Sequence, residues 1–160
     1  MCIRDSFNII KNSGKDLEDL ITNVLSLSEV NNKEIEKTAV SLQGVLDKVQ
    51  LNLSSIIKTT KANIITPTYD YNILGNEGQL YQLFQNFISN GIKYQPEGNQ
   101  PEVQISVNPL GERLLISVQD NGIGIEEEYL DEIFEPFQRL HSDSAYKGTG
   151  VGLSLSLIHI

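Results

Sequence analysis

Asparagines that could bind a metal ion recur along one predicted helix, residues 77–94. Asn86 and Asn90 are spaced i and i+4, so both lie on the same helix face. An asparagine side-chain oxygen can enter the octahedral oxygen shell that Mg²⁺ demands. A helical Asn pair taken alone is more often simply solvated. The whole face is polar but mostly uncharged, whereas an ordinary solvated face usually carries Glu and Lys. It comprises Gln79, Gln82, Asn86, Asn90 and Lys93.

A carboxylate follows a predicted strand in the segment DNGIGI, residues 120–125. Asp120 could accept a hydrogen bond from the exocyclic amine of a flat ring. Gly122 and Gly124 lack side chains, so the backbone could approach such a ring closely. The alternative is an ordinary Asp-Asn-Gly turn.

A glycine-rich segment, GTGVGL at residues 148–153, is typical of a loop that binds phosphate through backbone N–H groups. It has no Lys-Ser/Thr ending, which excludes a Walker A loop. It does not follow a strand within a βαβ unit, which disfavours a dinucleotide fold. The alternative is a flexible connector.

Composition limits the partners. The 160 residues include 12 Lys and Arg against 21 Asp and Glu, a formal net charge of −9. An acidic chain repels phosphate backbones, so we expect no nucleic-acid partner. One cysteine excludes an internal disulfide, and two histidines are too few for a metal cluster. No apolar run approaches a membrane span of roughly 18 residues, so we expect a cytoplasmic domain.

Periodicity predicts helices and strands in an α/β arrangement. Residues 7–30 carry a heptad-like apolar seam suited to packing on another helix, or else form an ordinary core helix. A short strand at 38–42 precedes a helix with Ser41 as its N-cap. The apolar face of that helix comprises Val45, Leu46, Val49, Leu53, Ile56 and Ile57.

Strands are also predicted on both sides of Pro67, at 63–66 and 71–74. After the helix at 77–94, alternation predicts strands at 103–107 and 114–118 around a turn at 109–112. A short acidic helix ending near Phe134 follows, and the next residues have no regular period.

Four segments in this order resemble the N, G1, F and G2 boxes of the histidine kinase catalytic domain. They are QNFISNGIKY (85–94), DNGIGI (120–125), IFEPFQRLH (133–141) and GTGVGLS (148–154). That domain belongs to an ATPase class shared with DNA gyrase, heat-shock chaperones and mismatch-repair ATPases. The amino-acid sequences of these segments are most similar to those of the phytochrome-type branch. The resemblance implies a Bergerat-type fold, a two-layer sandwich of a mixed sheet and helices.

The resemblance also implies roles in binding Mg²⁺ and ATP. Asp120 would accept the adenine amino group, with Gly122 and Gly124 shaping the base pocket. Asn90 would bind Mg²⁺ and Asn86 would lie near the phosphates. Lys93 would supply positive charge, and Tyr94 a ring near the nucleotide or simply packing.

Further implied roles fall in the second half of the resemblance. Phe134 and Phe137 would anchor a mobile lid over the nucleotide. Arg139 and Lys147 would reach the phosphates, or else be solvated lid charges. The triphosphate would be held by Gly148, Thr149, Gly150, Gly152 and Leu153.

The ends depart from the family pattern. Residues 7–32 resemble only the second helix of the dimerisation hairpin, and 33–154 the ATPase domain. Residues 1–6 and 155–160 match neither and are interpreted as non-native, with the fold incomplete at its C-terminus. His141 and His159 do not match the phosphoacceptor.

Function follows from the same resemblance. We expect a catalytic domain that passes the ATP γ-phosphate to a histidine on a dimerisation helix, in a homodimeric parent that acts on a response regulator. Autophosphorylation of the chain alone is not expected. The alternative is a nucleotide-binding scaffold of the same fold without kinase activity. A kinase acting on serine is a weaker option, because the 7–30 seam places a dimerisation helix upstream.

Overall fold

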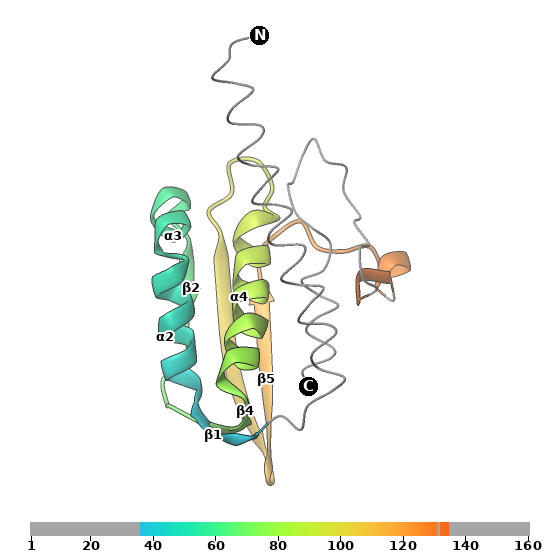
Figure 1. The fold of residues 1–160 in the computed structure, drawn as a ribbon. Coiled ribbons are helices and arrows are strands. Elements are labelled where there is room, and N and C mark those ends of the chain that lie inside the picture. The colour runs from blue at the N-terminus through green and yellow to red at the C-terminus, as the bar shows by residue number, and fades with distance from the viewer. Residues whose placement is uncertain (1–35, 131, 135–160) are drawn as a thin grey trace, which may run out of the picture. The chain divides into compact units, whose positions relative to one another are not determined.

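The computed structural model describes residues 36–130 and 132–134 (Figure 1). Residues 36–126 belong to one compact unit. The other described residues belong to a second unit and form two 3₁₀ turns, η1 (Glu127–Tyr129) and η2 (Glu132–Phe134). The predicted acidic helix is therefore wrong for the described residues. Successive glutamates repel one another, and a segment this short closes i to i+3 bonds, as Leu130 N–H does to Glu127 C=O at 3.3 Å.

A mixed three-stranded sheet forms one layer of the first unit. Its order is β2 (Asn63–Ile65), β4 (Glu102–Leu110), β5 (Arg113–Asp120). β2 runs parallel to β4, and β4 runs antiparallel to β5. The predicted 103–107 and 114–118 strands are confirmed and extended, because the connecting turn is shorter than expected. Gly111 supplies its left-handed residue with φ of 62°.

A second, two-stranded sheet pairs β1 (Thr38–Ser41) antiparallel with β3 (Asn72–Gly75). The strands predicted around Pro67 both exist, but they lie in different sheets. Asn63 N–H donates to Pro101 C=O at 2.8 Å, which draws β2 to the start of β4. Leu42 N–H donates to Tyr71 C=O at 2.8 Å, which draws β3 to β1 instead.

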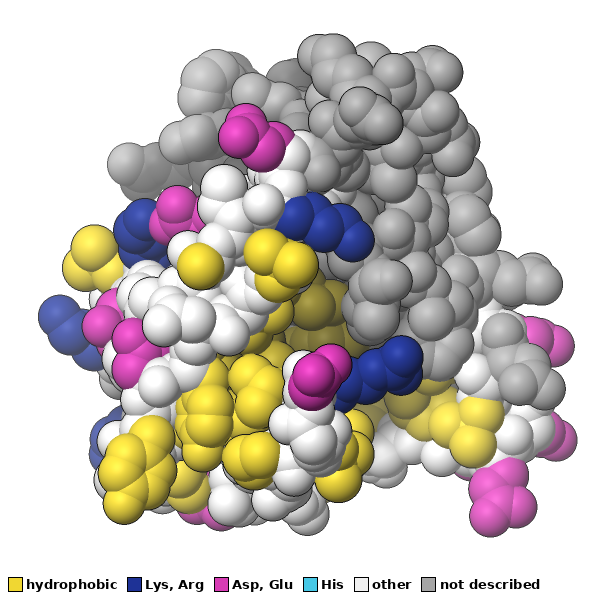
Figure 2. Space-filling view, turned by 90° about the horizontal axis from the view of Figure 1, so that it is seen from below, with side chains coloured by type: hydrophobic (Ala, Val, Ile, Leu, Met, Phe, Trp, Pro, Cys, Tyr) yellow, Lys and Arg dark blue, Asp and Glu magenta, His cyan; other side chains and the backbone are white. Residues whose placement is uncertain are grey.

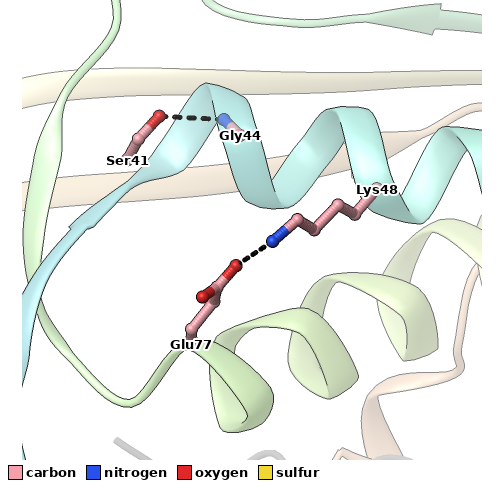
Figure 3. Close-up of polar contacts among 4 residues, drawn as sticks. All are labelled: Ser41, Gly44, Lys48 and Glu77. Atoms are coloured by element: carbon pink, nitrogen blue, oxygen red, sulfur yellow. Dashed lines mark hydrogen bonds and ion pairs between the residues drawn. The ribbon is translucent and has the colours of Figure 1, made fainter.

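The predicted helix after Ser41 is present but divided into α2 (Leu42–Asn52) and α3 (Ser54–Thr60). Ser41 is the N-cap, as predicted, and its Oγ accepts from Gly44 N–H at 2.9 Å (Figure 3). The helix breaks at Leu53, before a Ser-Ser pair whose side chains compete for backbone hydrogen bonds. None of the helices in the described ranges has the length and apolar character needed to cross a bilayer.

Asp70, from the loop before β3, completes the cap of α2. Its Oδ1 accepts from Gln43 N–H at 3.0 Å and its Oδ2 from the Ser41 hydroxyl at 2.8 Å. These donors hold the pKa of the Asp70 carboxyl below its usual range, with the Gln43 N–H as the larger cause and the Ser41 hydroxyl next. A loop distant in sequence therefore satisfies the first N–H groups of this helix.

The predicted helix at 77–94 is confirmed as α4 (Glu77–Lys93). Asn76 is its N-cap and accepts from Gln79 N–H at 3.1 Å. In Figure 1, α2 and α4 lie side by side against one face of the sheet. Lys48 of α2 pairs with Glu77 of α4 (Figure 3). Both side chains are more than half exposed, so this ion pair contributes little to the free energy of unfolding.

The core between the helices and the sheet is apolar and continuous. It comprises Val40, Leu42, Val45, Leu46, Val49, Phe84, Ile88, Ile92, Val103 and Ile105. Burial of these side chains, not the ion pair, fixes the helices on the sheet. The helix-on-sheet arrangement confirms the predicted two-layer fold.

Some apolar side chains remain outside the core. Tyr69 and Leu74, before and within β3, are each 73% exposed. Figure 2 views the lower end of Figure 1 and shows hydrophobic side chains gathered on that face beside charged ones. The surface of this unit is therefore not uniformly polar, despite the acidic composition.

Gly91 brings α4 unusually close to the sheet. A Cβ built there would lie 2.7 Å from Val103 Cγ2 and 3.1 Å from Asp120 Cβ. Glycine inside a helix costs about 1 kcal/mol relative to alanine. The close packing explains why the helix carries a glycine at this position.

Replacing Asp70 with asparagine tests the shared cap of α2. Because folding lowers the Asp70 pKa, the carboxylate adds to the free energy of unfolding above the unfolded pKa of about 3.9. That contribution is lost as the pH falls through the folded pKa. We expect Asp70→Asn to lower Tm at pH 7, and the difference from the unchanged chain to shrink below about pH 4. Thermal unfolding across pH measures this, with Asp47→Asn as control, since among the described residues Asp47 accepts only from the Gln43 side chain. A Tm difference that does not depend on pH would contradict this cap.

A pair of alanine substitutions in α4 tests the close approach at Gly91. Gly91→Ala should lower the free energy of unfolding by about 1–3 kcal/mol, because backbone and core side chains must shift. Gly78→Ala, in the first turn of the same helix, meets only the Asn76 side chain at 3.3 Å. That control should be neutral or stabilising by up to about 1 kcal/mol. Denaturant unfolding compares the two, and equal effects would show that space at Gly91 is not limiting.

Candidate functional site

The C-terminal end of α4 meets the end of β5, and this junction holds several of the predicted site residues. Asp120 is the last residue of β5 and pairs in register with Val103 of β4. Its Cβ lies against Gly91 of α4. The sequence thus places a carboxylate where a strand ends beside a helix, as predicted from the segment 120–125.

One oxygen of the Asp120 carboxylate has no partner in the part of the chain that the structure describes. Oδ1 accepts from Gly122 N–H at 2.8 Å, which closes a local turn. Within residues 36–130 and 132–134, Oδ2 accepts no hydrogen bond and no cation pairs with the group. The side chain is exposed. An exposed carboxylate oxygen with this geometry can accept a hydrogen bond from an amine on a ligand.

The two glycines of this loop have different reasons to be glycine. A Cβ on Gly122 would lie 2.3 Å from Tyr94 O, and Ile123 N–H donates to the same carbonyl at 3.0 Å. Gly122 therefore lets the loop dock on the end of α4. Gly124 has φ of 71°, with nothing within 4 Å of its built Cβ, so backbone conformation selects glycine there.

The polar face of α4 leads to the same junction. Asn86, Asn90 and Lys93 are all half-buried. Lys93 Nζ donates to the Tyr94 hydroxyl at 2.9 Å and lies 4.3 Å from the centre of that ring. This contact holds the ammonium group and the aromatic ring together at the end of the helix.

Asn90 fits one position in the shell of a hard cation. Its side chain makes no hydrogen bond to any residue in the described ranges, so its amide oxygen is available. Mg²⁺ takes oxygen ligands and usually keeps several waters beside one or two protein ligands. In the same ranges no three His, Cys, Asp or Glu side chains come together. A metal held by Asn90 would need its other ligands from water or a bound phosphate.

One part of the predicted residue set lies within the first unit. Those within the first unit are Asn86, Asn90, Lys93, Tyr94, Asp120, Gly122 and Gly124. Phe134 ends η2 in the second unit. The remaining predictions lie outside the described residues: Phe137, Arg139, Lys147, Gly148, Thr149, Gly150, Gly152 and Leu153. The predicted helix at 7–30 also lies outside them.

Sequence reasoning missed three residues of this junction. Gly91 allows α4 to approach Asp120, and its signal was a glycine between Asn90 and Ile92 inside an otherwise regular helix. Asn121 and Gln95 hydrogen-bond to one another at 3.0 Å. Asn121 was visible only as part of a turn, and nothing local distinguished Gln95.

Comparison with known proteins identifies the family. Residues 75–159 match the family model described as histidine kinase-, DNA gyrase B-, and HSP90-like ATPase. The chain is 40% identical to cyanobacterial phytochrome A of Nostoc sp., over 87% of this chain and 18% of that protein. It is 32% identical to sensor histidine kinase RppB of Synechocystis sp., over 99% of this chain and 35% of that one. The chain thus spans about a fifth to a third of the length of these relatives.

Solved structures share the fold. The full-length ShkA structure, in complex with AMPPNP, matches with a TM-score of 0.76 and 26% identity, over 97% of this chain and 33% of that one. The histidine kinase AdeS of Acinetobacter baumannii matches with a TM-score of 0.76 and 21% identity, over 95% of this chain and 70% of that one. The chain belongs to the histidine kinase-, DNA gyrase B- and HSP90-like ATPase family, as a domain of the kind found in sensor histidine kinases.

Proposed function

We propose that this chain binds Mg-ATP at the junction of α4 and β5, and that it is the part of a sensor kinase that delivers the γ-phosphate to a histidine. The observation that carries the proposal is the Asp120 carboxylate, which accepts from Gly122 N–H on one oxygen and, among the described residues, from no donor on the other. It lies beside a glycine-containing loop docked on α4. The similarity to ShkA, whose structure contains AMPPNP, supports a nucleotide at this fold.

Base recognition would depend on the direction of one hydrogen bond. The adenine amino group donates, and Asp120 Oδ2 accepts. Guanine would present a carbonyl oxygen at the same place, and two acceptors repel one another. Gly122 and Gly124 add no side chains where the flat base would lie. This chemistry selects adenine nucleotides over guanine nucleotides.

The phosphates and the metal would lie along the polar face of α4. Asn90 would contribute one oxygen to Mg²⁺, with Asn86 nearby and Lys93 adding positive charge. The segment from Gly148 to Leu153 would cradle the triphosphate through backbone N–H groups. Mg²⁺ would neutralise the charge that develops on the phosphate oxygens, which is the main requirement of phosphoryl transfer.

Transfer itself needs an acceptor imidazole in line with the γ-phosphate. The imidazole nitrogen would form the new N–P bond as the bond from the γ-phosphorus to the β–γ bridging oxygen breaks and ADP leaves. We place the acceptor on a dimerisation helix outside residues 33–154, and expect a response regulator to take the phosphate next. The parent protein would act as a homodimer. His141 and His159 are not assigned this role.

Replacing Asp120 with asparagine tests the base contact. The amide can turn a donor toward the base and no longer offers a carboxylate, so ATP and ADP affinity should fall about ten- to a hundredfold. GTP should bind poorly to the unchanged chain, whose carboxylate faces the guanine carbonyl. Isothermal titration calorimetry measures this, with Asp47→Asn, at an exposed position of α2, as the control. Equal binding of ATP and GTP, or full ATP affinity in Asp120→Asn, would contradict the assignment of Asp120 as the base-binding residue.

The proposed role of Asn90 as a Mg²⁺ ligand can be tested separately, through the effect of Mg²⁺ on ATP affinity. We expect Mg²⁺ to tighten ATP binding to the unchanged chain, and Asn90→Ala to remove most of that gain. Binding without Mg²⁺ should stay nearly the same, because Asn90 would act through the metal. Titrations with Mg²⁺ and with a chelator compare the two conditions, using Gln50→Ala of α2 as control. A variant that keeps the whole Mg²⁺ gain would exclude Asn90 as a ligand.

A further inference from the structure

Asn121 connects three segments directly beside Asp120. Its backbone N–H donates to Glu102 C=O at 3.2 Å, and its side-chain Oδ1 accepts from Glu102 N–H at 2.8 Å. Oδ1 also accepts from Gln95 Nε2 at 3.0 Å, and Nδ2 donates to Gln100 C=O at 3.0 Å. Asn99 Nδ2 donates to the Asn121 C=O at 3.1 Å. The residue therefore ties the end of β5 to the start of β4 and to the segment that follows α4.

Only an amide side chain can make this set of contacts. Two N–H donors, from Glu102 and Gln95, converge on one side-chain atom of Asn121, which must be an acceptor. A backbone carbonyl, from Gln100, faces the other atom, which must be a donor. An aspartate would lose that donor and set a second negative charge beside Asp120. A turn needs none of this, since glycine or serine would also serve there.

The contacts of Asn121 and those of the glycine-containing loop both hold the backbone next to Asp120. Asn121 anchors the backbone immediately after the carboxylate. Gly122 N–H binds Oδ1, and Ile123 N–H binds Tyr94 C=O at 3.0 Å. Together these bonds fix which way Oδ2 points. Asn121 is exposed and outside the apolar core, so its loss should affect this geometry more than the core.

We propose that Asn121, held by Gln95, is a positioning residue that aims the Asp120 carboxylate at the amino group of the bound base. The inference rests on the proposed nucleotide function and deepens it. It assigns part of the base selectivity to a residue that need not touch the nucleotide. Gln95 extends the connection to the end of α4, where the phosphate-facing residues lie.

The test compares ATP with purine riboside triphosphate, which lacks the amino group at position 6. The full chain should bind ATP more tightly than this analogue, because only ATP donates to Asp120. Asn121→Ala should lower ATP affinity about tenfold and leave analogue affinity nearly unchanged, since the lost term is a hydrogen bond to a charged group. Gln95→Ala should reduce the ATP preference by a smaller factor. Asn108→Ala, an exposed asparagine toward the other end of β4, should keep the full preference.

The possible outcomes distinguish the positioning role of Asn121 from the proposed contact between Asp120 and the base. A smaller ATP-to-analogue ratio in Asn121→Ala, with the Asn108→Ala ratio unchanged, supports the positioning role. An equal fall for both nucleotides, or an unchanged ratio, overturns it and leaves the nucleotide function intact. No preference for ATP in the unchanged chain would instead overturn the proposed base contact itself. If Asn121→Ala does not unfold cooperatively, the ratio in Gln95→Ala decides by the same criteria.

Discussion

The close contact between α4 and the end of β5 is the constraint on which the rest of the site depends. At Gly91 the helix backbone approaches Val103 and Asp120 so closely that one added methyl group has no space. This approach places the Asp120 carboxylate beside the helix that carries Asn86, Asn90 and Lys93. A helix displaced by the thickness of a side chain would separate the Asp120 carboxylate from the polar side chains of α4. Glycine lowers helix stability relative to alanine, but it leaves the space that this approach needs.

Several local interactions maintain that contact. Gly122 allows the loop after β5 to dock on Tyr94 C=O, and Asn121 joins the same loop to β4 and to Gln95. Core side chains of α2 pack against α4, and α2 is itself capped by Asp70 from the loop before β3. Each of these contacts joins segments distant in sequence. The site is therefore a product of the tertiary structure, although its residues fall in short recognisable segments.

Local signals predicted most of the elements but not their pairing. The helix at α4 and the hairpin of β4 and β5 follow from periodicity over adjacent residues, which the sequence displays directly. The parallel pairing of β2 with β4, and of β3 with β1, depends on contacts such as Asn63 with Pro101, which no local pattern reveals. The single predicted helix divided at Leu53 because weak helix formers follow it.

The candidate site shows the same division. The base-binding role followed only from the family resemblance, but the position of Asp120 at a strand end and the glycine-containing turn after it were predictable from the local sequence. Asn121 and Gln95 were not, because their importance lies in hydrogen bonds across 26 residues of sequence. Gly91 was an intermediate case. The sequence showed a glycine inside the predicted helix, but it did not show that this glycine would lie against Val103 and Asp120. The roles assigned to Asn90, Lys93 and Tyr94 remain predictions that the geometry permits.

A crystal structure of the chain with Mg²⁺ and a non-hydrolysable ATP analogue tests the central claim most directly. The account predicts the adenine amino nitrogen about 3 Å from Asp120 Oδ2. It also predicts that Gly122 N–H remains on Oδ1 and that the contacts of Asn121 with Glu102 and Gln95 are retained. Adenine bound away from the junction of α4 and β5, or Asp120 turned away from the base, would contradict it.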